Sequence, residues 1–147
     1  MDLDKILDHW AKDAKIDDIN LDNESGNIPV LHSKYLKFMA KERSKLNLLL
    51  QKRAELNRLL TDYYRGEANN PEDLKMLNRE PWQKVTLKAE VADYIAADKA
   101  TIKLNLMIAE QQEICKTLEE ILRQINGRNF QIKNMIDWKR LTQFGDA

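Results

Sequence analysis

Apolar residues recur at helical spacing over most of the chain. Residues 2–15 carry an apolar face that includes Ile6 and Trp10, which predicts a first helix there. Residues 17–29 are polar and contain Gly26 and Pro29, so this stretch is predicted to be a loop. A long helix is predicted over residues 30–64, because apolar positions continue at helical spacing until Gly66, a residue suited to a helix C-terminal cap.

The second half of the chain follows a similar pattern. Residues 67–82 contain Pro71 and Pro81 and predict a connection with one helical turn inside it. Residues 85–91 partly alternate between apolar and polar side chains, which favours an extended segment. A second long helix is predicted over residues 92–125, and Asn126 and Gly127 end it. A short helix over residues 129–143 completes an all-α chain of two long helices with short N- and C-terminal helices.

The first long helix carries a heptad seam, that is, a line of positions with alternating 4–3 spacing. Seven of its nine positions are apolar and two, Glu42 and Arg53, are charged; the positions are 35, 39, 42, 46, 49, 53, 56, 60 and 63. Residues 30–64 span about 52 Å as a helix, which exceeds the diameter of about 38 Å of a compact domain of this size. We therefore expect an elongated, oligomeric all-α protein; a monomeric helical hairpin with protruding ends is the alternative.

Composition narrows the class of protein. The chain has 147 residues, the size of a single domain, with 33% charged residues, 4 Gly and 3 Pro, which excludes collagen-like and low-complexity chains. Its single cysteine, Cys115, excludes a disulfide framework within the chain and favours a reducing compartment. Residues 1–7 lack the features of a signal peptide, and no apolar run approaches the length of a membrane span. We expect a soluble cytoplasmic protein with no membrane association.

The formal net charge of zero hides a segregation of charge along the chain. Residues 1–29 hold 8 acidic and 3 basic residues and are predicted to form an acidic N-terminal helix and linker. Residues 30–65 hold 9 basic and 3 acidic residues, so this stretch carries a net charge of +6. A strongly basic segment allows a polyanionic partner although the whole chain is neutral. We expect residues 30–147 to form the rest of a single domain.

Five lysines form a stripe beside the apolar face of the first long helix. They fall within an arc of about 80° on a helical wheel and are Lys34, Lys37, Lys41, Lys45 and Lys52. Two interpretations remain open: an ordinary solvated face, or a track for a row of phosphates, since neighbouring lysines at positions 34–45 step about 4.5–6 Å along the axis. Arg58 and Arg65 also lie away from the apolar arc. The candidate nucleic-acid-binding residues are these two arginines and the five lysines.

Aromatic residues interleave with these cations and could stack on single-stranded bases. Tyr35, Phe38 and Tyr63 lie on the apolar arc, however, which favours a place in the core; Tyr64 stands beside Arg65.

Signals for catalysis are weak. The two histidines, His9 and His32, lack a metal-ligand partner at helical spacing, and no glycine-rich phosphate loop is present. The patterns Glu90-x-x-Asp93 and Glu110-x-x-Glu113 resemble the magnesium-binding pairs of all-helical nucleotide pyrophosphatases but would lie about 30 Å apart on one helix. We expect no catalytic residue, no metal and no cofactor.

Four short strings together resemble one protein family. They occur in order at matching spacing and are Ser33-Lys34-Tyr35-Leu36, Asp62-Tyr63-Tyr64-Arg65-Gly66, Ala97-Asp98-Lys99 followed by Lys103, and Gly127-Arg128-Asn129-Phe130-Gln131-Ile132-Lys133. Over residues 28–142 the chain resembles the UvsY family of recombination mediator proteins from tailed phages. The family carries a basic pair two residues apart before its Asp-Tyr-Tyr; here the first position is Arg58 and the second is Leu60. Lys52, Arg53 or Arg65 could compensate.

The resemblance implies a function and a set of partners. It implies a non-enzymatic protein that binds single-stranded DNA and forms a ring-like homo-oligomer of about six or seven subunits. Such a mediator helps a RecA-like recombinase load onto strands covered by single-strand-binding protein, in the cytoplasm of the infected bacterium. It also implies that the C-terminal segment drives self-assembly; its apolar candidates are Phe130, Ile132, Met135, Ile136, Trp138 and Leu141. A helical oligomeric scaffold that binds only protein partners is the alternative.

Overall fold

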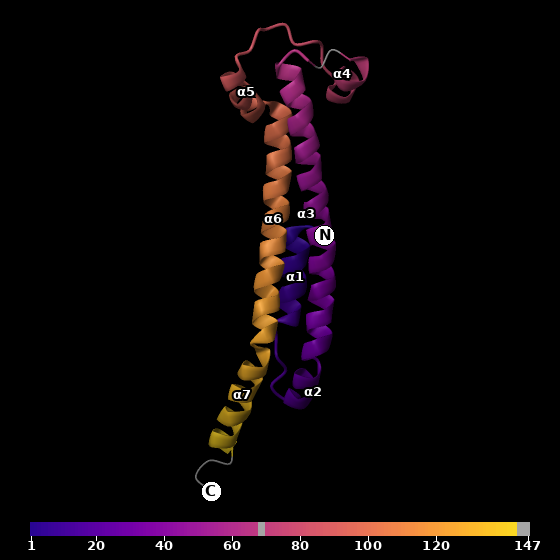
Figure 1. Ribbon diagram of the computed structural model, residues 1–147. Helices are drawn as coiled ribbons and strands as arrows, with labels where there is room; N and C mark the ends of the chain where they lie inside the picture. Colours follow the sequence, from indigo (N-terminus) through magenta and orange to yellow (C-terminus); the bar gives the residue numbers. More distant parts are fainter. Residues whose placement is uncertain (68–69, 144–147) are drawn as a thin grey trace. The chain divides into compact units, whose positions relative to one another are not determined.

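The computed structural model describes residues 1–67 and 70–143, and the regular structure in these residues is helical throughout (Figure 1). The helices are α1 (Leu3–Asp13), α2 (Leu21–Gly26), α3 (Ile28–Tyr64), α4 (Pro71–Leu77), the 3₁₀ turn η1 (Lys88–Glu90), α5 (Val91–Ala97), α6 (Lys99–Asn126) and α7 (Arg128–Gln143).

The all-α prediction and the helices expected over residues 2–15, 30–64 and 129–143 are confirmed, with small shifts at their ends. Three local predictions are wrong wholly or in part. The loop expected over residues 17–29 contains α2 and the start of α3. The extended segment expected over residues 85–91 is limited to its first part, where Leu87 has an extended backbone, since η1 begins at Lys88 and α5 at Val91. The helix expected over 92–125 is broken at Asp98 into α5 and α6. A short helix, α4, does lie in the connection over 67–82, of which residues 68–69 fall outside the described part.

Helix α3 ends as its glycine predicts. Gly66 has φ 76°, in the left-handed region that glycine adopts without a steric penalty. Its N–H donates to the carbonyl of Tyr63 at 3.1 Å, and the next N–H, of Glu67, donates to the carbonyl of Asp62 at 2.9 Å. This pair of bonds is the Schellman arrangement, which satisfies carbonyls that would otherwise be left without partners at the helix end.

The chain separates into two compact units. Unit 1 is Met1–Ser44 with Gln112–Ala147, and unit 2 is Lys45–Gln111. The two long helices α3 and α6 contribute residues to both, so each unit is considered by itself.

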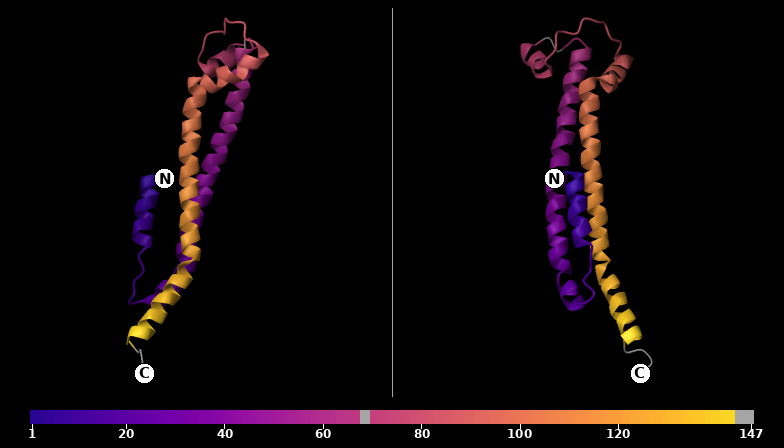
Figure 2. Two further views of the ribbon diagram at one scale, coloured as in Figure 1. Left: turned by 90° about the vertical axis from the view of Figure 1, so that its left-hand side faces the viewer. Right: turned by 180° about the vertical axis from the view of Figure 1, so that it is seen from behind.

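In unit 1, α1 lies antiparallel to the first part of α3 (Figures 1 and 2). The Trp10 and Tyr35 rings meet edge to face with centroids 5.5 Å apart, and the amino group of Met1 lies 3.1 Å from the carboxylate of Glu42. The core of unit 1 consists of fully or nearly fully buried side chains, which include Ile6, Tyr35, Met39, Leu118, Ile121, Ile125 and Ile132. Burying such side chains is the main stabilising term available to α1, which is short for an independent helix.

The chain changes direction at Gly127, between α6 and α7 (Figure 1). The next residue, Arg128, is only 5% exposed. Its guanidinium donates to the carbonyls of Ala14 and Lys15 at 3.3 and 3.1 Å, and to the carboxylate of Glu24 at 3.1 Å. Arg128 therefore satisfies carbonyls that follow the end of α1 and ties the start of α7 to the N-terminal segment of the same unit.

Unit 2 has its own core at the end of α3. Leu60, Tyr63, Tyr64 and Val91 are buried there, and partly buried residues pack around them: Leu56, Leu74, Leu77, Trp82, Tyr94 and Ile95. The Tyr64 ring stacks on Tyr94 at 5.3 Å and meets Trp82 edge to face at 4.7 Å, which are favourable ring geometries. This aromatic cluster holds the connection after α4 against α3 and α5.

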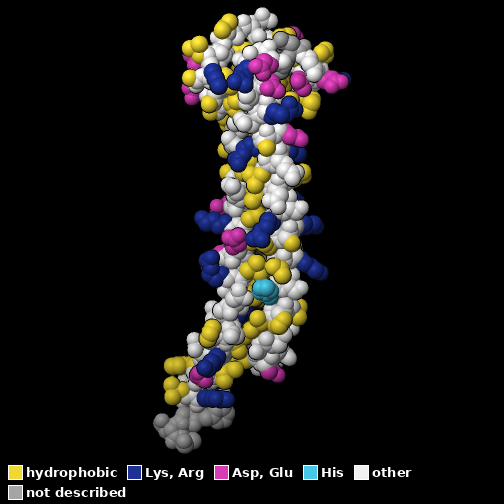
Figure 3. Space-filling model, in the orientation of Figure 1, with side chains coloured by type: hydrophobic (Ala, Val, Ile, Leu, Met, Phe, Trp, Pro, Cys, Tyr) yellow, Lys and Arg dark blue, Asp and Glu magenta, His cyan; other side chains and the backbone are white. Residues whose placement is uncertain are grey.

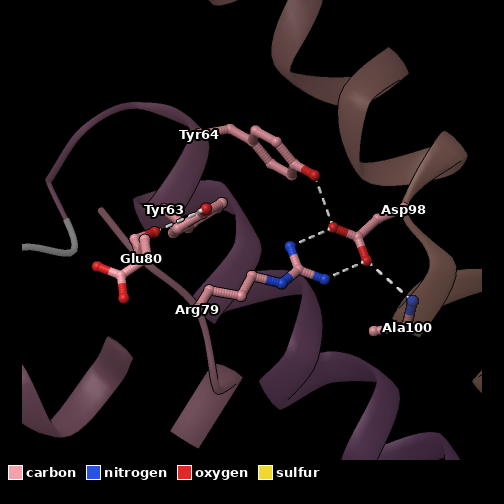
Figure 4. Close-up of polar contacts among 6 residues, drawn as sticks. All are labelled: Tyr63, Tyr64, Arg79, Glu80, Asp98 and Ala100. Carbon is pink, nitrogen blue, oxygen red and sulfur yellow. Dashed lines mark hydrogen bonds and ion pairs between the residues drawn. The ribbon is translucent and has the colours of Figure 1, made fainter. Parts of the chain in front are cut away.

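Asp98 explains the break between α5 and α6 (Figure 4). Its backbone is extended, and its carboxylate accepts a hydrogen bond from the Ala100 N–H at 2.9 Å, so it caps the start of α6. Arg79 donates to both carboxylate oxygens, at 2.5 and 2.6 Å, and the Tyr64 hydroxyl donates to one of them at 2.6 Å. Asn78, which caps the end of α4, has a left-handed backbone conformation, and Arg79 is the next residue in the chain.

Neighbouring groups in this network shift the pKa values of Asp98 and Tyr64. Burial would raise the pKa of Asp98, but hydrogen bonds from Arg79 and Tyr64 outweigh it and lower the pKa to about 2. Burial and the hydrogen bond to Asp98 raise the pKa of Tyr64 to about 12. The Asp98 side chain is only 2% exposed, so its negative charge depends on these donors.

We expect Asp98→Asn to lower the free energy of unfolding by about 3 kcal/mol at neutral pH, because Arg79 then loses its carboxylate partner. A folded-state pKa of about 2, against an ordinary value of 3.8, gives wild type a stabilisation that is present above about pH 4 and lost as the pH falls toward 2. The difference between wild type and variant should therefore shrink by about 2 kcal/mol over that window. Urea unfolding followed by circular dichroism at several pH values measures it.

Asp93→Asn is the control, since Asp93 is exposed on α5 and belongs to the same unit. Its difference from wild type should stay near zero from pH 7 to 2. A constant difference between wild type and Asp98→Asn across this range would contradict the role given to the Asp98 carboxylate.

Candidate nucleic-acid interface

Three lysines of the predicted stripe belong to unit 1, and one of them has an acidic partner. The Lys34 ammonium lies 2.6 Å from the carboxylate of Asp13, and the Tyr35 hydroxyl donates to the same carboxylate at 2.9 Å. Burial would raise the pKa of Asp13, but these two donors outweigh it and lower the pKa below its ordinary value. Lys34 is therefore partly neutralised by α1, whereas Lys37 and Lys41 are exposed.

The remaining candidates belong to unit 2. Lys45 and Lys52 are exposed and seven residues apart, so they share one face of α3. Arg58 and Arg65 are also exposed; the Arg58 guanidinium lies 3.6 Å from the Asp62 carboxylate, a loose surface pair that leaves most of its charge available. In each unit the basic residues thus lie at the surface, in reach of a phosphate backbone.

The aromatic residues near these cations are not available as a stacking platform. Tyr35 is 0% exposed, and Tyr63 and Tyr64 are each 7% exposed. Phe38 is half-buried against the Tyr35 ring. Single-stranded bases cannot stack on rings that already pack in the core, so these aromatic residues offer no stacking surface.

Most of the candidate self-assembly residues on α7 reach the surface. Phe130, Trp138 and Leu141 are about two-thirds exposed, and hydrophobic side chains gather over this helix in Figure 3. Ile132, in contrast, is 2% exposed and belongs to the core of unit 1, so it is not free to meet another subunit. Met135 and Ile136 are half-buried. An apolar surface of this kind is typical of a contact with another protein chain.

A cavity in unit 2 was not anticipated from the sequence. It has a volume of about 380 Å³ and lies where α3, α5 and α6 meet, lined by Leu50, Arg53, Ala54, Leu56, Asn57, Ile95, Thr101 and Asn105. The signal in the sequence was Arg53, a charged residue in a seam position.

Two further classes of site were sought within residues 1–67 and 70–143. No group of three or more His, Cys, Asp or Glu side chains there is arranged to hold a metal ion. None of the helices in the same residues combines the length and apolar character that a membrane crossing requires.

Comparison with known proteins identifies the family to which this chain belongs. The model of the UvsY family, described as "Recombination, repair and ssDNA binding protein UvsY", matches residues 9–144. The chain belongs to the UvsY family. It is 26% identical over 140 residues to the recombination protein uvsY of Enterobacteria phage T4, which covers 95% of this chain and 96% of that protein.

Solved UvsY structures show the same fold. Two crystal forms of the bacteriophage T4 recombination mediator protein UvsY match with TM-scores of 0.81 and 0.82 at 22% sequence identity. The matches cover 95% of this chain and 96% and 98% of those chains. The all-helical architecture is therefore that of UvsY, which extends the resemblance first noted over residues 28–142 to nearly the whole chain.

The resemblance to the UvsY family predicts a basic pair at positions 58 and 60. Leu60 is 0% exposed and part of the unit 2 core, so a basic residue there would have to be buried. Arg58 remains at the surface two positions earlier. Lys52, Arg53 and Arg65, the neighbours expected to compensate for the second cation, are exposed.

We expect Lys34 to react with an amine-acetylating reagent about two- to fivefold more slowly than Lys37, because Asp13 holds its ammonium group. Asp13→Asn should raise the rate at Lys34 toward that of Lys37 and leave Lys37 unchanged. Mass spectrometry of peptides after brief labelling measures both rates. Equal rates in the wild-type protein would contradict the ion pair.

Proposed function

We propose that this UvsY-family protein is a recombination mediator that binds single-stranded DNA without sequence preference and promotes loading of a RecA-like recombinase onto DNA covered by single-strand-binding protein. The observation that carries the proposal is the set of exposed cations on α3, in a chain that matches a single-stranded-DNA-binding family along nearly its whole length. The candidate contacts are Lys37, Lys41, Lys45, Lys52, Arg58 and Arg65, with Lys34 available only when Asp13 releases it.

Phosphate contacts by cations are independent of sequence, and they suit a protein that must act anywhere along a strand. The exposed lysines are flexible point charges, so they can follow an irregular single-stranded backbone better than a rigid base-reading surface could. Aromatic stacking has no place in this region, since the tyrosines are buried.

Self-assembly would strengthen this modest binding. We propose a ring-like homo-oligomer of about six or seven subunits, held together through the exposed apolar side chains of α7. Each further contact between the strand and the ring is then intramolecular, so several weak sites give strong binding. A strand held at many points around a ring is bent, which would weaken the hold of single-strand-binding protein and present the DNA to the recombinase.

The proposal assigns this chemistry to binding alone, with no catalytic step, metal or cofactor. It also places the action on phage DNA in the cytoplasm of the infected bacterial host, where recombinase and single-strand-binding protein act.

We expect the double variant Lys41→Glu and Lys45→Glu to weaken binding to a 20-nucleotide single strand by about tenfold or more at low salt, because two cations become two anions beside the phosphates. Its oligomeric mass should not change, because neither lysine lies on α7. Fluorescence anisotropy measures the affinity and analytical ultracentrifugation measures the mass.

Lys75→Glu with Lys116→Glu is the matched control. It makes the same change of net charge at exposed positions on α4 and α6. Equal losses in both double variants would mean that only net charge matters, and would remove the α3 lysines from the proposal. Failure of the wild-type protein to bind any oligonucleotide would leave a scaffold that binds only proteins.

A further inference from the structure

The cavity in unit 2 arises because polar residues occupy seam positions at which apolar side chains would pack the two helices together. Arg53 stands in the heptad seam of α3, where the neighbouring seam positions 49, 56 and 60 are leucine. On α6, Thr101 continues the line of positions 104, 108 and 115, which hold leucine, isoleucine and cysteine. Both polar residues line the cavity. Because neither can interlock as an apolar side chain does, the two helices leave a space of about 380 Å³ at this level.

Two polar side chains around this space, Arg53 and Thr101, lack a partner among the described residues. Arg53 is exposed and makes no ion pair among the described residues. The Thr101 hydroxyl is shut off from solvent yet has no hydrogen-bond partner in the described part of the chain. The Arg53 guanidinium beside an unfilled seam points to a ligand that the cavity serves.

The chemistry of the walls narrows the class of ligand. Leu50, Leu56 and Ile95 offer apolar surfaces, and the Asn57 and Asn105 amides can each donate and accept a hydrogen bond. A flat ring with donors and acceptors along its edge fits such walls. The volume falls in the range of about 300–1,000 Å³ that small-molecule sites occupy. Arg53, exposed among the lining residues, is suited to a neighbouring phosphate, because its planar guanidinium can pair with two phosphate oxygens.

We propose that this cavity receives one nucleobase of the bound single strand, with Asn57 and Asn105 contacting the base edge and Arg53 the adjacent phosphate. The proposal rests on the proposed binding of single-stranded DNA and adds a base-dependent contact to the phosphate contacts of the lysines. It also gives a physical reason for strand preference, since the base edges of a duplex are already paired and stacked and cannot enter a pocket. Amides that both donate and accept can serve different bases, so the contact is compatible with weak sequence preference.

The first test compares two oligonucleotides with the full-length wild-type protein. One is a single strand of mixed sequence, and the other has the same phosphates with abasic sites throughout its central half. We expect the abasic strand to bind about tenfold more weakly at the same salt concentration, since it can fill no cavity. Equal affinities would overturn the base pocket and leave the proposed binding of single-stranded DNA intact. Absence of binding to either strand would overturn both proposals.

Two variants locate the effect. Asn105→Leu replaces an amide of the cavity wall with an apolar side chain without a change of charge, and Arg53→Leu restores an apolar seam residue and removes the cation. Both should weaken binding of the intact strand and bring the ratio of intact to abasic affinity close to one. Arg53→Leu should also unfold at the same or a higher temperature than wild type, which separates a lost contact from a lost fold.

Gln112→Leu is the matched control for Asn105→Leu. It lies seven residues further along α6, so it shares the same face, and it does not line the cavity. Its affinity ratio should equal that of wild type. A wild-type ratio in both cavity variants would overturn the assignment of the base contact to this cavity.

Discussion

A charge in the apolar seam of a helix must find a partner or reach solvent, because an unpaired charge in a protein interior is strongly unfavourable. Helix α3 contains two such positions. In unit 1, Glu42 is 2% exposed and is held by the amino group of Met1. In unit 2, Arg53 makes no ion pair among the described residues and lines an open cavity. The charged seam residue is therefore paired and buried in unit 1. In unit 2 it lies beside an open cavity, where we place a ligand.

Acidic residues of the N-terminal segment also form ion pairs with basic residues of unit 1. Asp13 accepts from Lys34 and Tyr35, and Glu24 accepts from the buried Arg128. The segment thus serves as part of the unit 1 core and neutralises one end of the basic stripe, while Lys37 and Lys41 stay exposed. Removal of this segment would expose Tyr35 and other core residues as well as a cation, so truncation would destabilise unit 1.

Local signals in the sequence were enough to predict much of the fold, while long-range partners were not visible. Periodicity located α3 and α7, and Gly66 marked the end of α3 because left-handed φ favours glycine. The break at Asp98 was missed, since an aspartate within a helical pattern becomes a cap only through partners such as Arg79 and Tyr64, 19 and 34 positions away. Likewise, the lysine stripe was predictable, but neither the pairing of Lys34 with Asp13 nor the burial of Ile132 was.

In the proposed function, cations on the surface of this protein hold the phosphates of a single strand. The most direct measurement is the affinity for a single-stranded oligonucleotide, and for a duplex of the same sequence, at several salt concentrations. We predict tighter binding of the single strand, with the logarithm of the binding constant falling linearly with the logarithm of salt at about 0.7 per phosphate contact. No binding at low salt, or an affinity that does not change with salt, would contradict it.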